Sequence, residues 1–165
     1  MQHPVQYWLM KSEPEECSID DALAAAKHTV PWTGVRNYQA RNYMRDSMRI
    51  GDGVLFYHSS CEPPGIAGLA EVASTAYPDP TQFDRKSDYY DAKVKAGEPR
   101  WFLVDVRALR KTRLIGLDEL RAQAPLARMV TLQRGNRLSI TPVTASEWKH
   151  ITTKMLATRM LARGK

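Results

Sequence analysis

The sequence predicts a mixed α+β domain built around a small, curved or barrel-like β-sheet. Three observations predict this fold class: predicted strands outnumber predicted helices, most strands are separated by short turns, and their order is not a regular strand–helix alternation. The 165 residues fit one domain, and the 43% apolar content is enough for a core without disulfide staples.

The first predicted elements are a strand and two helices. Residues 6–11 are short, aromatic and apolar, which is typical of a buried strand. Ser18 has the character of a helix N-cap, and two acidic residues follow it, so a helix through about Lys27 is expected. A second helix is predicted over residues 38–48 after an irregular loop.

The middle of the chain predicts two neighbouring strands. A glycine-containing turn at 51–53 precedes a strong apolar strand at 54–58, and a further strand is expected at 66–75. Gly65 and Gly68 in or beside that strand favour bending or a close approach of another backbone.

The second half completes the sheet and adds two helices. Four segments are expected: a turn-rich structured loop at 77–87, the longest strand at 101–109, a short helix at 116–123 and a last strand within 133–143. Thr144 and Glu147 form a capping-box pattern, which predicts a final helix to about Leu161 and a frayed basic tail after it.

Composition excludes several classes of site. Cys17 and Cys61 form no C-x-x-C pair, which favours a reducing, cytoplasmic location over a disulfide framework. The four histidines lack metal-ligand spacing, so no metal and no cofactor are expected. No apolar run is long enough to span a bilayer and the first residues lack a signal-peptide pattern, so we expect a soluble intracellular protein with no membrane partner.

The charge is unevenly distributed along the chain. The formal net charge is +6, yet residues 1–82 hold 6 Lys/Arg and 10 Asp/Glu, whereas residues 83–165 hold 18 and 8. A basic half attracts polyanions such as nucleic acids. It is equally compatible with a solvated surface that keeps the protein soluble.

The run from Val30 to Arg45 carries the strongest functional signal. Trp32 lies in a loop, where its ring can remain accessible to stack on a base. Arg36 can fork onto phosphate or guanine, and Asn37 can pair with a base edge, although Asn37 is also a good helix cap. Two further arginines in this run, Arg41 and Arg45, either contact phosphate or are only solvated.

Two strand ends add candidate groups. The polar side chains of Lys11, Ser12 and Glu13 follow the first strand, where they contact a base edge or satisfy the backbone of the turn. The strand at 54–58 also ends in polar residues, and its histidine invites an acid–base interpretation. A basic turn at 133–139 is a plain hairpin or a phosphate-facing rim.

Together these motifs resemble the EVE domain family of the PUA-like superfamily, whose eukaryotic form is the thymocyte nuclear protein family. The resemblance covers nearly the whole chain through these segments: YWLMKSEP at 7–14, PWTGVRNYQARN at 31–42, GDGVLFYHSS at 51–60, GIAGLAEV at 65–72, YPDPTQFD at 77–84, YYD at 89–91 and RGNRLSITPV at 134–143. It implies one domain over residues 1–165, with a PUA-like pseudo-barrel flanked by helices.

The resemblance also implies a pocket that reads a modified base in DNA or RNA, as in the related YTH readers. The expected base-binding residues are Lys11, Ser12, Glu13, Pro14, Trp32, Val35, Arg36, Asn37, Tyr57, His58 and Ser59. The expected phosphate or backbone contacts are Arg41, Arg45, Arg134 and Arg137.

The leading hypothesis is a non-enzymatic binding module whose downstream action needs an effector protein. A hydrolase acting on a modified nucleoside is the first alternative, with Lys11, Glu13 and His58 as acid–base candidates. A structural RNA-binding protein that ignores modification is the second, and it would use the basic C-terminal half.

Overall fold

The computed structural model describes residues 4–157 and contains a six-stranded mixed sheet and a two-stranded sheet. The main sheet consists of β1 (Tyr7–Ser12), β2 (Thr29–Pro31), β3 (Gly53–His58), β4 (Gly65–Val72), β7 (Asp105–Gly116) and β8 (Ile140–Val143). The small sheet pairs β5 (Tyr77–Pro78) with β6 (Phe102–Leu103). The predicted α+β fold class is confirmed.

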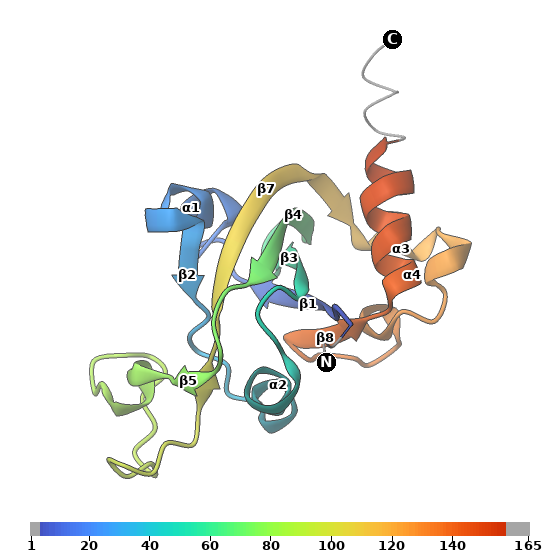
Figure 1. Ribbon diagram of the computed structural model, residues 1–165. Coiled ribbons are helices and arrows are strands. Elements are labelled where there is room, and N and C mark those ends of the chain that lie inside the picture. The colour runs from blue at the N-terminus through green and yellow to red at the C-terminus, as the bar shows by residue number, and fades with distance from the viewer. Residues whose placement is uncertain (1–3, 158–165) are drawn as a thin grey trace.

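The main sheet has the strand order β2-β7-β4-β3-β1-β8. Only β1 and β3 run parallel, and the other neighbours are antiparallel. The long strand β7 arches across the molecule in Figure 1 and gives the sheet its strong curvature. Because β1 and β3 run in the same direction, their carboxyl ends lie at the same edge of the sheet.

The helices are short. The α-helices are α1 (Ile19–Ala24), α2 (Tyr38–Asn42), α3 (Leu117–Arg121) and α4 (Ala145–Lys149). Two of them continue as π-helical turns, Tyr43–Ser47 after α2 and His150–Met155 after α4. Single 3-10 turns lie at Ala26–His28, Pro80–Phe83, Ala124–Leu126 and Val130–Leu132.

The core has two parts because alternate residues of each strand point to opposite faces. On β1, Trp8 and Met10 pack with α1 and α2, while Leu9 packs on the other face. That second face is covered by α3 and by the helix that begins with α4, including Leu120 and Ile151. In Figure 1, α1 lies to the left of the curved sheet, α2 lies below it, and α3 and α4 lie to its right.

Both predicted capping patterns are confirmed. The Ser18 hydroxyl accepts a hydrogen bond from the Asp21 backbone, and Thr144 and Glu147 form a reciprocal capping box. Asn37 also caps a helix, because its Oδ1 accepts the Ala40 N–H at 3.0 Å. The two interpretations of Asn37 are thereby resolved in favour of the cap.

The first helix is shorter than its alanine-rich sequence predicts. It ends at Ala24, and Lys27 and His28 both have a φ of 55°, in the left-handed region. This tight turn leads into β2. The sequence did not predict this strand, which pairs with β7. Sheet pairing therefore overrides local helix propensity here.

The predicted strand at 101–109 is split in two. Phe102–Leu103 pairs with β5, and β7 begins only at Asp105 but continues to Gly116. Leu103 and Val104 are both fully buried at this break between the two strands. The predicted close approach at Gly68 is confirmed, since a Cβ there would lie 2.8 Å from the Arg110 carbonyl oxygen.

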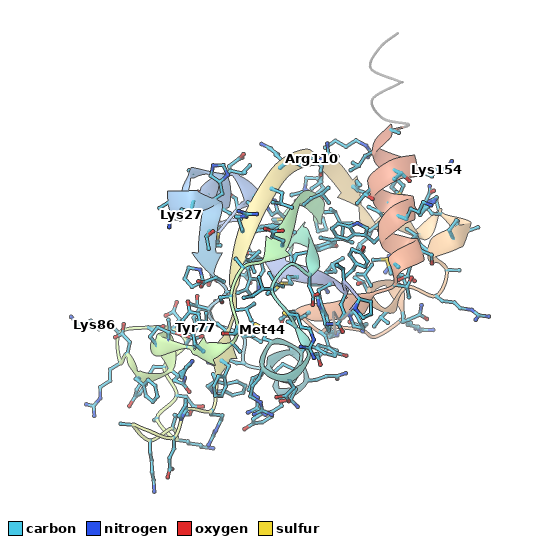
Figure 2. All side chains as sticks on the ribbon, in the orientation of Figure 1. Lys27, Met44, Tyr77, Lys86, Arg110 and Lys154 are labelled. Atoms are coloured by element: carbon cyan, nitrogen blue, oxygen red, sulfur yellow. The ribbon has the colours of Figure 1, made fainter. Side chains whose placement is uncertain are left out.

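Residues 77–100 form an extension that projects from the main sheet in Figure 1. Figure 2 shows Lys86 on this extension and Lys154 on the helix at the opposite end of the molecule. The last residues of the predicted final helix and the predicted basic tail lie outside the described residues.

Candidate functional site

A cavity of about 550 Å³ opens at the edge of the sheet where β1 and β3 end. Its lining residues are Lys11, Ser12, Glu13, Glu16, Cys17, Val30, Pro31, Trp32, Thr33, Gly34, Val35, Arg36, Ser59, Ser60, Tyr89, Asn136, Arg137 and Ser139. We call residues 11–13 and 59–60 the strand wall, and residues 30–36 with Tyr89 the loop wall. The volume is in the range of pockets that enclose a small organic group such as a base.

Parallel pairing creates the strand wall. Ser12 lies opposite His58 in the β1–β3 register, and the Ser59 N–H donates to the Ser12 carbonyl at 3.0 Å. The Ser12 hydroxyl donates to the Cys17 carbonyl at 2.7 Å, so its oxygen retains lone pairs for another donor. Two sequence motifs 46 residues apart thus meet at one edge.

Lys11 supplies the positive charge of the strand wall. Its ammonium lies 5.8 Å from the centre of the Tyr57 ring and has no hydrogen bond or ion pair among residues 4–157. Burial lowers the pKa of Lys11 below its usual value. A half-buried, unpaired ammonium is a strong donor available to a carbonyl or anionic oxygen of a ligand.

Trp32 forms the floor of the cavity. Its ring is less accessible than expected, since the residue is only 6% exposed and packs edge-on against Phe56 at 5.2 Å, and only a small part of it faces the cavity. Its backbone N–H donates to the Val104 carbonyl, which ties the loop to the strand segment beside it. The indole N–H has no hydrogen-bond partner among the described residues.

Gly34 fixes the shape of the loop wall. It has a φ of +86°, and a Cβ at this position would lie 2.6 Å from the Tyr89 ring. Its N–H donates to Asp79 Oδ2 at 2.8 Å. Glycine is therefore required for both the backbone conformation and the close contact with Tyr89.

Arg36 supports the loop wall from within. Its Nε and Nη2 donate to the Tyr89 carbonyl, and Nη2 also donates to the Thr81 hydroxyl. Its Nη1 donates to the Val35 carbonyl and to Asp79 Oδ2 at 3.1 Å. All five N–H groups are therefore engaged, which corrects the expectation that Arg36 forks onto phosphate or guanine.

Asp79 connects this wall to the extension and was not predicted as a site residue. The side chain is fully buried and accepts four hydrogen bonds, from Gly34, Arg36 and both the amide and hydroxyl of Thr81. The sequence signal was the Asp-Pro pair that starts a 3-10 turn, since Asp79 is its N-cap. A single carboxylate thus organises two segments more than 40 residues apart.

Two carboxylates face the cavity from the turn after β1. Tyr89 donates its hydroxyl to Glu16 at 2.5 Å, which links the loop wall to this turn. Burial and this hydrogen bond raise the pKa of Tyr89 well above its usual value. Glu13 also lines the cavity and is exposed. With Glu13 and Glu16 beside Lys11, the cavity offers acceptors and donors together, which suits a neutral base edge better than a phosphate.

Four predicted pocket residues do not line the cavity. Pro14 lies in the turn beyond Glu13, and Asn37 caps α2. Tyr57 is 3% exposed and belongs to the core on the far face of the sheet.

His58 is used within the fold and does not line the cavity. Its Nε2 accepts the N–H of Ile19 at 3.1 Å, at the start of α1. Burial lowers the pKa of His58, which favours the neutral ring that this bond requires. The acid–base trio of Lys11, Glu13 and His58 is therefore not assembled in the cavity.

The predicted phosphate contacts are dispersed. Arg137 lines the cavity, whereas Arg134 is exposed outside its lining. Arg41 donates to the Arg100 carbonyl at 2.9 Å, and Arg45 is paired with Asp46 on the surface. Only Arg137 therefore lies at the cavity itself.

Sequence reasoning missed the residues that come from distant segments. Glu16, Tyr89, Asn136 and Ser139 line the cavity but belong to turns without hydrophobic periodicity. The signal for Tyr89 was its place in the YYD motif of the family resemblance.

Residues 4–157 contain no group of three or more His, Cys, Asp or Glu side chains placed to hold a metal ion. In the same range, no helix has both the length and the apolar character needed to cross a bilayer.

Comparisons with known proteins agree on one family. A family model described as the EVE domain matches residues 6–154. Thymocyte nuclear protein 1 of Homo sapiens is 44% identical over 163 residues, with 88% of this chain and 72% of that protein covered. The crystal structure of human THYN1 protein in complex with 5-methylcytosine-containing DNA has a TM-score of 0.85 and 44% identity, covering 90% and 96% of the two chains. A crystal structure from Pseudomonas syringae has a TM-score of 0.86 and 46% identity, covering 91% and 99%.

Proposed function

This chain belongs to the EVE domain family, and from that premise we propose that it is a non-enzymatic module that binds a modified nucleobase in a nucleic acid. The observation that carries the proposal is the cavity, which is large enough for one base and offers unpaired polar groups beside an aromatic floor. The human relative crystallised with DNA containing 5-methylcytosine, so this base is the first ligand to test.

The groups of the cavity match what a base edge requires. Lys11 and the Trp32 indole provide donors, while Glu13 and the Ser12 hydroxyl provide acceptors. A carboxylate accepts well from an exocyclic amino group such as that of cytosine. A base in a duplex must first flip out, which costs a few kcal/mol, so an unpaired base is expected to bind more tightly.

The decisive experiment is a binding panel at one fixed salt concentration. Fluorescence anisotropy should compare strands with one central 5-methylcytosine and matched plain strands, as DNA and RNA, single- and double-stranded. We expect tighter binding of at least one modified strand than of its plain counterpart. Equal binding of all pairs, with a steep salt dependence, would instead indicate a modification-independent RNA- or DNA-binding protein.

The same panel tests the absence of catalysis. After prolonged incubation, chromatography of the digested strands should recover every modified nucleoside unchanged, because no acid–base trio is assembled at the cavity. Release of a free base or a deaminated product would identify the protein as a hydrolase.

We extend the proposal to RNA as a second ligand, to a cytoplasmic location and to an effector protein that acts after binding. The basic second half of the chain supports nucleic-acid binding of either kind. The free thiols of Cys17 and Cys61 are compatible with a reducing compartment. Affinity capture with the modified strand present and absent would test for a ligand-dependent effector.

A further inference from the structure

A stacked aromatic pair lies next to the cavity but outside its lining. The ring of Tyr38 stacks on Trp101 with centroids 5.0 Å apart and an interplanar angle of 24°. Trp101 is 5% exposed, whereas Tyr38 is 52% exposed. Trp101 therefore holds an exposed tyrosine ring in a fixed orientation, and such aromatic surface gains free energy when it is covered.

The Arg41 guanidinium lies beside this stack. Its carbon is 4.8 Å from the centre of the Tyr38 ring and 5.9 Å from that of Trp101, so one cation makes a cation–π contact with both rings. A group centred over the outer face of Tyr38 would be much farther from Trp101. The guanidinium therefore leaves part of that face open, in agreement with the 52% exposure of Tyr38.

Arg41 makes no ion pair with a carboxylate among residues 4–157, although the nearby Asp46, which pairs with Arg45, partly offsets its charge. Its N–H groups donate to the Asn42 side chain and to the Arg100 carbonyl, which are neutral acceptors. Arg45 follows one turn later on the same helical segment and faces the Phe102 ring at 6.0 Å. An exposed aromatic ring with an arginine beside it is an arrangement that binds a base and its phosphate.

The stacked pair of Tyr38 and Trp101, which we call the platform, is in contact with the loop wall of the cavity. Arg36 lies 5.4 Å from the Trp101 ring and 5.4 Å from the Tyr89 ring, so one guanidinium contacts both the platform and the loop wall. Tyr38 follows Arg36 by two residues, which limits the distance between their Cα atoms to about 7 Å. A strand with one base in the cavity would pass within reach of Tyr38.

We propose that Tyr38 is a second stacking site, which takes an unpaired base that neighbours the modified base on the same strand, while Arg41 contacts the adjoining phosphate. The inference rests on the proposed function, since the cavity holds the modified base. It adds a preference for single-stranded or locally opened nucleic acid, because the outer face of Tyr38 can only receive a base that is free of its own stacking partner.

The test uses a single-stranded DNA 9-mer with one central 5-methylcytosine and its plain counterpart. Tyr38→Ala should weaken binding of the modified strand about tenfold, and Tyr38→Phe should leave it unchanged, because stacking needs the ring and not the hydroxyl. Tyr90→Ala is the matched control, since Tyr90 is an exposed tyrosine without a ring contact among the described residues. Thermal unfolding checks that each variant is folded.

Abasic positions placed one and two nucleotides on either side of the modified base identify the occupant. We expect one abasic position to weaken binding to the wild-type protein as much as Tyr38→Ala does, and to cause no further loss in that variant. Unchanged binding by Tyr38→Ala, or losses from the two changes that simply add, would overturn the proposal. Loss upon both Tyr38→Ala and Tyr38→Phe would also overturn it.

The two proposals fail in different ways. The ratio of affinities for modified and plain strands reports the cavity, and Tyr38→Ala should preserve it. Non-additive losses from Tyr38→Ala and one abasic position instead indicate that a base stacks on Tyr38. A wild-type ratio near one with the coupling intact would overturn the proposed function and support the stacking site.

Discussion

On the strand wall of the cavity the Lys11 ammonium makes no hydrogen bond or ion pair among the described residues, whereas on the loop wall all five N–H groups of Arg36 donate to the protein itself. Both walls carry a cation and both line the same cavity. The difference separates two roles: the loop wall holds the cavity in shape, and the strand wall keeps polar groups available for a ligand. Buried polar groups that are satisfied rigidify a structure.

The largest effect should come from removing the carboxylate that organises the loop wall. Asp79→Ala leaves the Arg36 guanidinium and the Gly34 N–H without their common acceptor. Breaking a buried pair in this way costs about 3–5 kcal/mol, because one charge remains uncompensated. Urea unfolding monitored by tryptophan fluorescence would measure the loss.

Asp46→Ala is the matched control for that prediction. Asp46 also pairs with an arginine, but the pair with Arg45 is exposed on both sides. Little change in the free energy of unfolding is expected for this variant. If the two variants were equally stable, the loop wall would not depend on its internal ion pair, and the contrast between the walls would fail.

Lys11→Met should have the opposite signature. It removes a donor that the fold does not use, so modified-strand affinity should fall about tenfold or more, as expected for a hydrogen bond from a charged group. Stability should stay equal or rise, because burial of the ammonium is unfavourable in the folded state. Anisotropy and urea unfolding of the same preparation give both numbers.

Lys149→Met controls for the general loss of positive charge, since this exposed lysine lies on α4. Its affinity should change little at physiological salt. A Lys11 variant that lost stability but kept its affinity would place Lys11 in the scaffold and reverse the assignment of the two walls.

Gly34→Ala isolates the contact between the loop wall and Tyr89. A left-handed residue other than glycine costs about 1–2 kcal/mol through backbone strain alone. Gly97→Ala provides this strain without a clash, because Gly97 has a φ of +85° and nothing within 4 Å of its added Cβ. We expect Gly34→Ala to cost about 1 kcal/mol more than Gly97→Ala, by thermal unfolding, since its Cβ would overlap the Tyr89 ring.

Removing the Tyr89 ring should abolish that difference. In the Tyr89→Ala background, the stability losses from Gly34→Ala and Gly97→Ala should become similar. A persistent difference would mean that the clash with Tyr89 is not what makes Gly34 necessary.

The sequence predicted the fold better than it predicted the roles of individual side chains. Strand patterns and helix caps depend on neighbours in the chain, and the caps at Ser18 and Thr144 were therefore confirmed. The early end of α1 and the start of β2 depend on pairing with β7, about 75 residues away, and no local pattern reports such pairing.

The site shows the same limit more strongly. Arg36 has the residue type of a ligand contact, but its type could not reveal that Asp79, Thr81 and the Tyr89 backbone would occupy it. Trp32 likewise lies in a loop, yet the edge of Phe56 and the Val104 carbonyl draw it into the core. Whether a polar or aromatic group is available to a ligand depends on contacts between distant segments.

The smallest expected effect concerns His58, the last residue of β3, whose ring accepts a hydrogen bond within the fold. Its neutral Nε2 accepts the Ile19 N–H, and its pKa lies below the ordinary value of 6.5 mainly through burial. The stabilising contribution is therefore complete above pH 6.5 and is lost as the pH falls from 6.5 toward the lowered pKa of the folded state. His58→Gln keeps an acceptor that does not titrate, so wild-type stability should fall relative to this variant between pH 7.5 and pH 5, measured by urea unfolding. Parallel pH profiles would show that the ring accepts no such bond and would make His58 a candidate ligand contact again.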